Sequence, residues 1–150
     1  SFRIFQLYKW SGLKSRWPNK NILVFMKKKI QLKIVKKEID KFCKMTKDSN
    51  ILHKKNFYKI HSHKYKNIVV PGILLITKIN QIISRKFQGA ILLDLISNFK
   101  QPVYLNELNS LHHKIKVINK KNNLLELSAE IKNKSKIKAY FKINFIITKQ

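Results

Sequence analysis

The spacing of apolar residues changes several times along the chain, and each change predicts a new element. Residues 30–34 alternate between apolar and polar, which is typical of a half-buried strand because successive strand side chains point to opposite faces. Over 38–46 the apolar residues recur at helical spacing, which predicts a short helix. Phe57 and Tyr58 fit another helical turn, and the basic stretch 61–67 predicts a loop.

Pro71 opens the longest helix that the pattern predicts, because its missing N–H costs nothing at a helix start. Apolar residues then recur at helical spacing to about Phe87, over so wide an arc that the helix must be enclosed. The enclosure is predicted by four runs rich in β-forming residues, at about 90–99, 107–118, 124–132 and 137–148. With the early strand, these runs indicate an α+β domain in which an antiparallel sheet of about five strands wraps around one central helix.

The length of 150 residues is sufficient for one domain, which we expect to span 26–150. Residues 1–25 are basic and contain no acidic residue, so we expect a leader or a disordered tail there. A transit peptide has this composition, but a flexible tail or an extension upstream of a start at Met26 is favoured. Because no apolar run approaches about eighteen residues, we expect no membrane span. A cytoplasmic location follows, or an organellar matrix if 1–25 directs import.

The net charge of +26 comes from 33 basic and seven acidic residues. Such a charge permits nucleic acid or an anionic membrane surface as a partner. The lysines are spread over the whole chain, however, which favours a general compositional bias, and nucleic acid is an unlikely partner. The single cysteine, Cys43, lies in an apolar-periodic stretch and is interpreted as a small core residue. No spacing of histidines predicts a metal site, and no cofactor is expected.

Asp48 and His53 place a carboxylate and an imidazole five positions apart, a pairing suited to general acid and base chemistry on a shared water. The two side chains converge only if the chain turns between them, and Ser49 and Asn50 are good turn formers. Gly72, at the first turn of the long helix, would expose unsatisfied N–H groups that can bind an oxyanion. Each feature alone is also compatible with an ordinary turn and a surface histidine.

Taken together, these features resemble the MaoC-like hydratases and dehydratases, a family with the hotdog fold that includes the (R)-specific enoyl-CoA hydratases. The resemblance runs from about Ile30 to Ile147. The family's Thr-Gly-Asp-x-Asn-Pro-Leu/Ile-His motif is matched by Thr46, Asp48, Asn50, Leu52 and His53, with departures at Lys47 and Ile51. The family's Val-Pro-Gly-Ile-Leu-Leu stretch is present at 70–75, and its Phe-x-x-Pro-Val-x-x-Gly-Asp stretch at 99–107, with Asn106 in place of glycine and Glu107 in place of aspartate.

The resemblance implies reversible syn hydration of a trans-2-enoyl thioester, carried by coenzyme A or an acyl carrier protein, in fatty-acid metabolism. Asp48 and His53 would be the catalytic pair, the Gly72 N–H the oxyanion hole, and Asn50 a support of the loop. The resemblance also implies a homodimer, with the acyl chain entering between helix and sheet. The side chains that close such a tunnel set the acyl chain length, and the sequence does not choose among candidates such as Ile79, Ile83, Leu92 and Leu95.

Other interpretations remain open at this point. In the related (3R)-hydroxyacyl-carrier-protein dehydratases, a histidine at the position of His63 acts with a glutamate at the position of Thr77, so half of that mechanism is missing here. His63 is therefore interpreted as a loop residue, and His61, His112 and His113 as surface or strand residues. A hotdog thioesterase, a non-catalytic acyl-CoA-binding module and a basic nucleic-acid-binding protein are the alternative functions.

Overall fold

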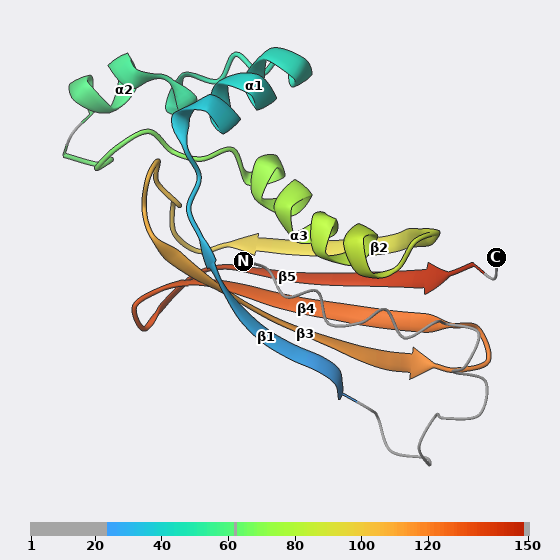
Figure 1. Cartoon of the computed structure of the whole chain (residues 1–150). Helices are drawn as coiled ribbons and strands as arrows, with labels where there is room; N and C mark the ends of the chain where they lie inside the picture. The colour runs from blue at the N-terminus through green and yellow to red at the C-terminus, as the bar shows by residue number, and fades with distance from the viewer. Residues whose placement is uncertain (1–23, 62, 149–150) are drawn as a thin grey trace, which may run out of the picture.

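A single antiparallel sheet dominates the computed structural model, which describes residues 24–61 and 63–148 (Figure 1). Within these residues the strands are β1 (Val24–Leu32), β2 (Ala90–Phe99), β3 (Asn109–Asn119), β4 (Leu124–Asn133) and β5 (Lys136–Ile147). Their order across the sheet is β1-β3-β4-β5-β2, so β1 and β2 form the two edges. The five-stranded antiparallel sheet predicted from the sequence is confirmed.

The helices lie on one side of this sheet, and the longest of them packs along its inner face (Figure 1). They are α1 (Lys36–Thr46), the short 3-10 helix η2 (Ile51–His53), α2 (Lys55–Ile60) and α3 (Gly72–Lys86). The predicted long helix is therefore α3, and α1 and α2 gather near its N-terminal end. None of the helices within the described residues is long and apolar enough to cross a membrane.

The predicted boundary between a leader and the domain falls close to the first described residue. Strand β1 begins at Val24, so its first two residues belong to the stretch 1–25 that was expected to precede the domain. The rest of that expectation concerns residues 1–23, which lie outside the described residues.

The inner face of the sheet is built from alternate residues of the three central strands, as the pleat requires. In one row across the sheet, Ile115 pairs with Leu127 and Leu127 with Ile143, and all three are fully buried. Ile79 of α3 is equally buried in the same core cluster. The helix therefore serves as the second layer of the fold, since each layer covers the apolar face of the other.

The outer face of the three central strands is polar and carries paired charges. Glu126 of β4 accepts hydrogen bonds from Lys116 and Lys142, each at 2.9 Å. Burial acts to raise the pKa of Glu126, but the two lysines outweigh it and hold that pKa below its usual range. Five of the seven acidic residues form an ion pair with a lysine, namely Glu38, Asp40, Glu107, Glu126 and Glu130.

His113 is an exception among the apolar residues of the inner face. It lies on β3 opposite Lys28 of β1, it is 4% exposed, and neither ring nitrogen has a hydrogen-bond partner within the described chain. Burial, followed by the charges of Lys86 and Lys28, lowers the pKa of His113 from its ordinary value. The histidine is a strand residue, as predicted, but it is buried in the sheet's inner face.

Replacing His113 with leucine should therefore stabilise the fold. At pH 8 the gain should be about 1–3 kcal/mol, because two unpaired buried nitrogens are removed. Since the folded-state pKa is depressed, the unfolded chain takes up the proton first, and parent stability falls as the pH drops below about 6.5. The advantage of His113→Leu should thus be larger at pH 5.5 than at pH 8 in urea unfolding. The exposed His63→Leu serves as control, and an equal advantage at both pH values would contradict the account.

Candidate functional site

The candidate site begins where α1 ends. Lys47 follows the helix with φ 54°, in the left-handed region, and the turn allows the Asp48 N–H to donate to the Cys43 carbonyl at 2.9 Å. Helix ends of this type usually carry glycine, because a side chain in the left-handed region is sterically strained. Glycine is also the residue that the family resemblance leads one to expect at position 47. Lysine keeps the same turn at some cost in stability.

Asp48 and His53 face each other across a tight double turn. Asp48 Oδ1 accepts the Asn50 N–H at 2.9 Å, and the side-chain oxygen of Asn50 accepts the Leu52 N–H at 3.1 Å. The turn expected from the sequence is therefore present, and it winds directly into η2. As a result, Asp48 Oδ2 lies 3.7 Å from His53 Nε2, which is too long for a direct hydrogen bond.

The imidazole of His53 is buried, and the backbone of residues 68–70 fixes its orientation. Its Nδ1 lies 2.7 Å from the carbonyl oxygen of Val69. Because a carbonyl only accepts, Nδ1 must carry the hydrogen, so Nε2 of the neutral ring is an acceptor directed toward Asp48. The Val69 N–H in turn donates to the Leu52 carbonyl at 3.0 Å. Val69 therefore hydrogen bonds to both the imidazole ring and the backbone of the turn.

The same segment is bonded on its other side to the loop that follows β2. The Val70 N–H donates to the Val103 carbonyl at 2.8 Å, and the Leu105 N–H donates to the Ile68 carbonyl at 2.9 Å. Residues 68–70 therefore act as a short strand between the Asp48 turn and the β2–β3 loop. This strand leads directly into α3.

Gly72 is the first residue of α3, so its N–H belongs to the group that has no acceptor within the helix. Its backbone does not adopt a positive φ, which means that its conformation would suit any residue. The reason for glycine is the ring of Phe99: a Cβ added at position 72 would lie 2.9 Å from Phe99 Cζ. Any larger residue at position 72 would therefore force the Phe99 ring to move.

The β2–β3 loop is anchored by Lys138, a buried lysine of β5. Its Nζ donates to the Pro102 carbonyl at 2.9 Å and to the Glu107 carboxylate at 2.6 Å, while its own carbonyl accepts the Lys100 N–H at 2.8 Å. Removing one partner of such a buried pair typically costs about 3–5 kcal/mol. Asn106 of this loop has φ 60°, which confirms that asparagine adopts a conformation usually given to glycine.

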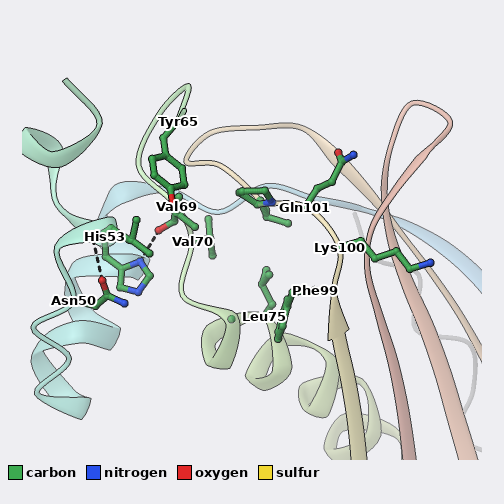
Figure 2. Close-up of a pocket in the computed structure, with 13 residues that line it drawn as sticks. Asn50, His53, Tyr65, Val69, Val70, Leu75, Phe99, Lys100 and Gln101 are labelled. Carbon is green, nitrogen blue, oxygen red and sulfur yellow. Dashed lines mark hydrogen bonds between the residues drawn. The ribbon is translucent and has the colours of Figure 1, made fainter. Parts of the chain in front are cut away.

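These segments enclose a pocket of about 410 Å³ beside the first turns of α3 (Figure 2). Figure 2 shows Asn50 and His53 on one side of the pocket and Lys100 and Gln101 on the other. Most of the wall is apolar, as in sites for small molecules. The lining residues are Asn50, Leu52, His53, Tyr65, Val69, Val70, Gly72, Leu75, Phe99, Lys100, Gln101, Pro102 and Val103.

Three of the four residues predicted for the site line this pocket, namely Asn50, His53 and Gly72. Asp48 is not one of the lining residues. Its carboxylate lies beside the pocket, next to Nε2 of the lining residue His53. Sequence reasoning did not assign Tyr65 or Leu75 to the site, and it found no role for Phe99 beyond its place in the family's Phe-x-x-Pro-Val stretch. Two stretches of the family resemblance carried the available signal, since 70–75 contributes Val70, Gly72 and Leu75 to the wall and 99–103 forms a continuous part of it.

His63 and Thr77, the positions of the alternative dehydratase arrangement, both lie outside the pocket wall. His63 is exposed in a turn, and the Thr77 hydroxyl donates to the Ile73 carbonyl within α3 at 2.9 Å. Cys43 packs against the core, and burial, followed by the charges of Asp48 and Asp40, raises the pKa of its thiol. Among residues 24–61 and 63–148, no group of three or more His, Cys, Asp or Glu side chains could hold a metal ion.

Comparison with known proteins identifies the fold. No family model matches the sequence, and no curated protein matches it either. The structure is similar to the (R)-hydratase from A. caviae involved in PHA biosynthesis, with a TM-score of 0.70 and 17% identity, covering 87% of this chain and 100% of that chain. It is also similar to R-hydratase PhaJ1 from Pseudomonas aeruginosa, with a TM-score of 0.69 and 19% identity, over 85% of this chain and 83% of that chain.

A third similar structure is the C-terminally truncated HadBC (3R-hydroxyacyl-ACP dehydratase) complex from Mycobacterium tuberculosis. Its TM-score is 0.60 at 12% identity, over 81% of this chain and 95% of that chain. At such identities the similarity defines the fold, and this chain has the hotdog fold that the family resemblance implied.

The strained turn at Lys47 yields a test of the site's local structure. Lys47→Gly should stabilise the protein by about 1 kcal/mol, because glycine adopts a left-handed φ without strain. Equilibrium urea unfolding measures the change. Lys44→Gly, inside α1, is the matched control and should lose about 1 kcal/mol. Loss of stability at position 47 as well would show that the turn does not have the described conformation.

Proposed function

We propose that this protein is a hydratase or dehydratase of trans-2-enoyl thioesters, which interconverts them with (R)-3-hydroxyacyl thioesters. The observation that carries the proposal is the orientation of His53 and Asp48. Nε2 of the neutral ring and the carboxylate oxygen are both acceptors, and they face each other at 3.7 Å. A water molecule that donates one hydrogen to each would satisfy both groups.

In the proposed reaction this water is the nucleophile. As its oxygen bonds to C3 of the substrate, Asp48 or His53 takes up one of its protons, and a proton is delivered to C2 on the same face. In the reverse direction the C3 hydroxyl leaves as water after the C2 proton has been removed. The pair is suited to both directions because it contains one anionic base and one imidazole held in a fixed orientation by the Val69 carbonyl.

The proposed oxyanion hole is the Gly72 N–H at the start of α3. Negative charge develops on the thioester oxygen as the water adds, and a free N–H at the positive end of a helix stabilises it. Gly72 and His53 line the same pocket. A thioester carbonyl bound at Gly72 would therefore have its C2–C3 bond on the side of the Asp48–His53 pair. Asn50 supports this arrangement by capping η2 through its side chain.

The substrate is proposed to be carried by coenzyme A or an acyl carrier protein, in fatty-acid metabolism and in the cytoplasm, or in an organellar matrix if residues 1–25 direct import. Lys100 lies on the pocket wall, and Lys64 lies with its Nζ 5.5 Å from the centre of the Tyr65 ring, another wall residue. These cations suit the phosphate groups of either carrier. A nucleic-acid-binding protein would also use exposed aromatic side chains to stack on bases, and Trp10, Trp17 and Tyr65 are candidates in the sequence. The two tryptophans lie outside the described residues, and Tyr65 belongs to the pocket.

Asp48→Asn is expected to lower turnover of trans-2-butenoyl-CoA by about 10²–10⁴-fold, because the base is lost. The asparagine oxygen can still accept the Asn50 N–H, so the turn and the fold should persist. Loss of enoyl-thioester absorbance measures the rate, and circular dichroism checks folding. Asp40→Asn, which removes an exposed carboxylate of α1, should leave the rate unchanged. An Asp48→Asn protein as active as the parent would refute the proposed role of Asp48.

We further propose that the protein forms a homodimer through the edge strand β2. Five apolar side chains of this strand are 46–54% exposed: Ile91, Leu92, Leu93, Ile96 and Phe99. An edge strand also presents unpaired N–H and C=O groups, and its length of ten residues suits pairing with a second copy. Both features would be satisfied by the same contact.

Introducing charge on β2 should therefore separate the two protomers. The double variant Leu93→Lys/Ile96→Lys is expected to be monomeric in light scattering at a concentration where the parent is dimeric. Ile118→Lys changes an equally exposed isoleucine of β3 and should remain a dimer. A dimeric double variant, or a monomeric parent, would contradict the proposed interface.

A further inference from the structure

We infer that Phe99 closes the acyl end of the pocket and makes the site selective for short-chain enoyl thioesters. The inference rests on the proposed function and names the substrate class of that same site. It is carried by the packing of one aromatic ring between the start of α3 and the sheet.

The ring of Phe99 lies directly against the first residue of α3. Its Cζ, Cε2 and Cε1 atoms lie 2.9, 3.1 and 3.3 Å from the place that a Cβ of residue 72 would occupy. On its other side the ring packs edge-to-face on Phe141, with ring centres 5.5 Å apart and planes at 79°. Phe141 is fully buried in the sheet's inner face. The ring, although 46% of Phe99 is exposed, thus lies between Gly72 and the core residue Phe141.

Phe99 and Leu75 both line the pocket, and Figure 2 shows them close together beside the first turns of α3. The next apolar residues along the inner face of this helix, Ile79 and Ile83, are 0% and 2% exposed and belong to the core cluster. Protein interiors of this kind are closely packed, so a chain cannot continue past the two wall residues without displacing a side chain.

This differs from the tunnel that the family resemblance led us to expect. None of its four candidate side chains, Ile79, Ile83, Leu92 and Leu95, lines the pocket in the described structure. The residues in that role are instead Phe99 and Leu75. The pocket volume of about 410 Å³ is also near the small end of ligand sites, which span about 300–1,000 Å³.

Because the reacting carbonyl is proposed to bind at the Gly72 N–H, this packing limits the length of the acyl chain. A thioester oxygen at the Gly72 N–H places the first carbons of the substrate beside Gly72, and the ring of Phe99 touches Gly72. The acyl chain therefore meets the ring within a few carbon atoms of the carbonyl. A four-carbon chain fits in front of Phe99, whereas an eight-carbon chain needs the space that the ring fills.

The test compares kcat/KM for trans-2-butenoyl-CoA and trans-2-octenoyl-CoA. The parent should prefer the four-carbon substrate, and Phe99→Ala should raise the octenoyl-to-butenoyl ratio by at least about tenfold, since each methylene bound in an apolar pocket changes the rate by about 10–200-fold. Phe99→Leu should shift the ratio less in the same direction, and it provides the answer if the alanine variant does not fold. Phe57→Ala, in α2 and outside the pocket wall, should leave the ratio at the parent value.

The possible outcomes separate this inference from the proposed function. A parent that prefers octenoyl-CoA, or a folded Phe99 variant with an unchanged ratio, would overturn the inference while leaving a hydratase in place. A folded parent that hydrates neither substrate would overturn the proposed function itself.

A double-mutant cycle tests the contact directly. Gly72→Ala should lower kcat/KM for butenoyl-CoA in the parent, because its methyl group meets the Phe99 ring. In the Phe99→Ala background the same substitution should cost about tenfold less, a coupling typical of residues in contact. An equal penalty in both backgrounds would show that the ring does not determine the need for glycine, and would count against its position beside Gly72.

Discussion

The candidate site depends on three residues of extended backbone, 68–70, that are hydrogen bonded on both sides. One side binds the turn of Asp48 and His53, through the Leu52 carbonyl and the imidazole. The other side binds the β2–β3 loop. Because the segment also leads into α3, these bonds hold the acid and base pair, the pocket wall and the free N–H groups of the helix in one fixed arrangement. Without these bonds, nothing would hold the Asp48–His53 turn and the β2–β3 loop in place beside the start of α3.

The rest of the fold supports this segment from two directions. The sheet and α3 bury each other's apolar faces, which fixes where the helix begins. Lys138 then fixes the β2–β3 loop, because one buried ammonium group bonds both the Pro102 carbonyl and the Glu107 carboxylate. The loop carries the far wall of the pocket, so a charged pair outside the pocket holds that wall in place. Phe99 connects the two supports, since its ring contacts both Gly72 and Phe141.

Features that depend on local pattern were predictable from the sequence. The alternation in the strands, the proline before α3 and the turn formers after Asp48 each act over a few residues, and each element is present in the structure. The order β1-β3-β4-β5-β2 is a property of long-range pairing, and periodicity does not encode it. The burial of His113 shows the same limit, because its neighbours on the inner face come from other strands and from α3.

Within the site, the difference between local pattern and long-range contact is clearest at Gly72. Its role as the first residue of a helix follows from Pro71, but the side chain that would collide with a larger residue there lies 27 positions away, at Phe99. Similarly, the sequence places Asp48 and His53 near each other, whereas the tautomer of the imidazole is determined by the Val69 carbonyl. Long-range contacts of single atoms determine these chemical details, and one sequence without its relatives contains no direct signal for them.

The central claim is that Asp48 and His53 deliver a water and a proton to one face of an enoyl thioester. It is tested most directly by hydrating trans-2-butenoyl-CoA in deuterium oxide and examining the product by NMR. The account predicts a single diastereomer of (R)-3-hydroxybutyryl-CoA with one deuterium at C2, on the face that carries the new hydroxyl. Reversal of a syn reaction removes the same deuterium, so the label should stay on that face. Deuterium on both faces of C2, release of free coenzyme A by hydrolysis, or no reaction with a folded protein would contradict the account.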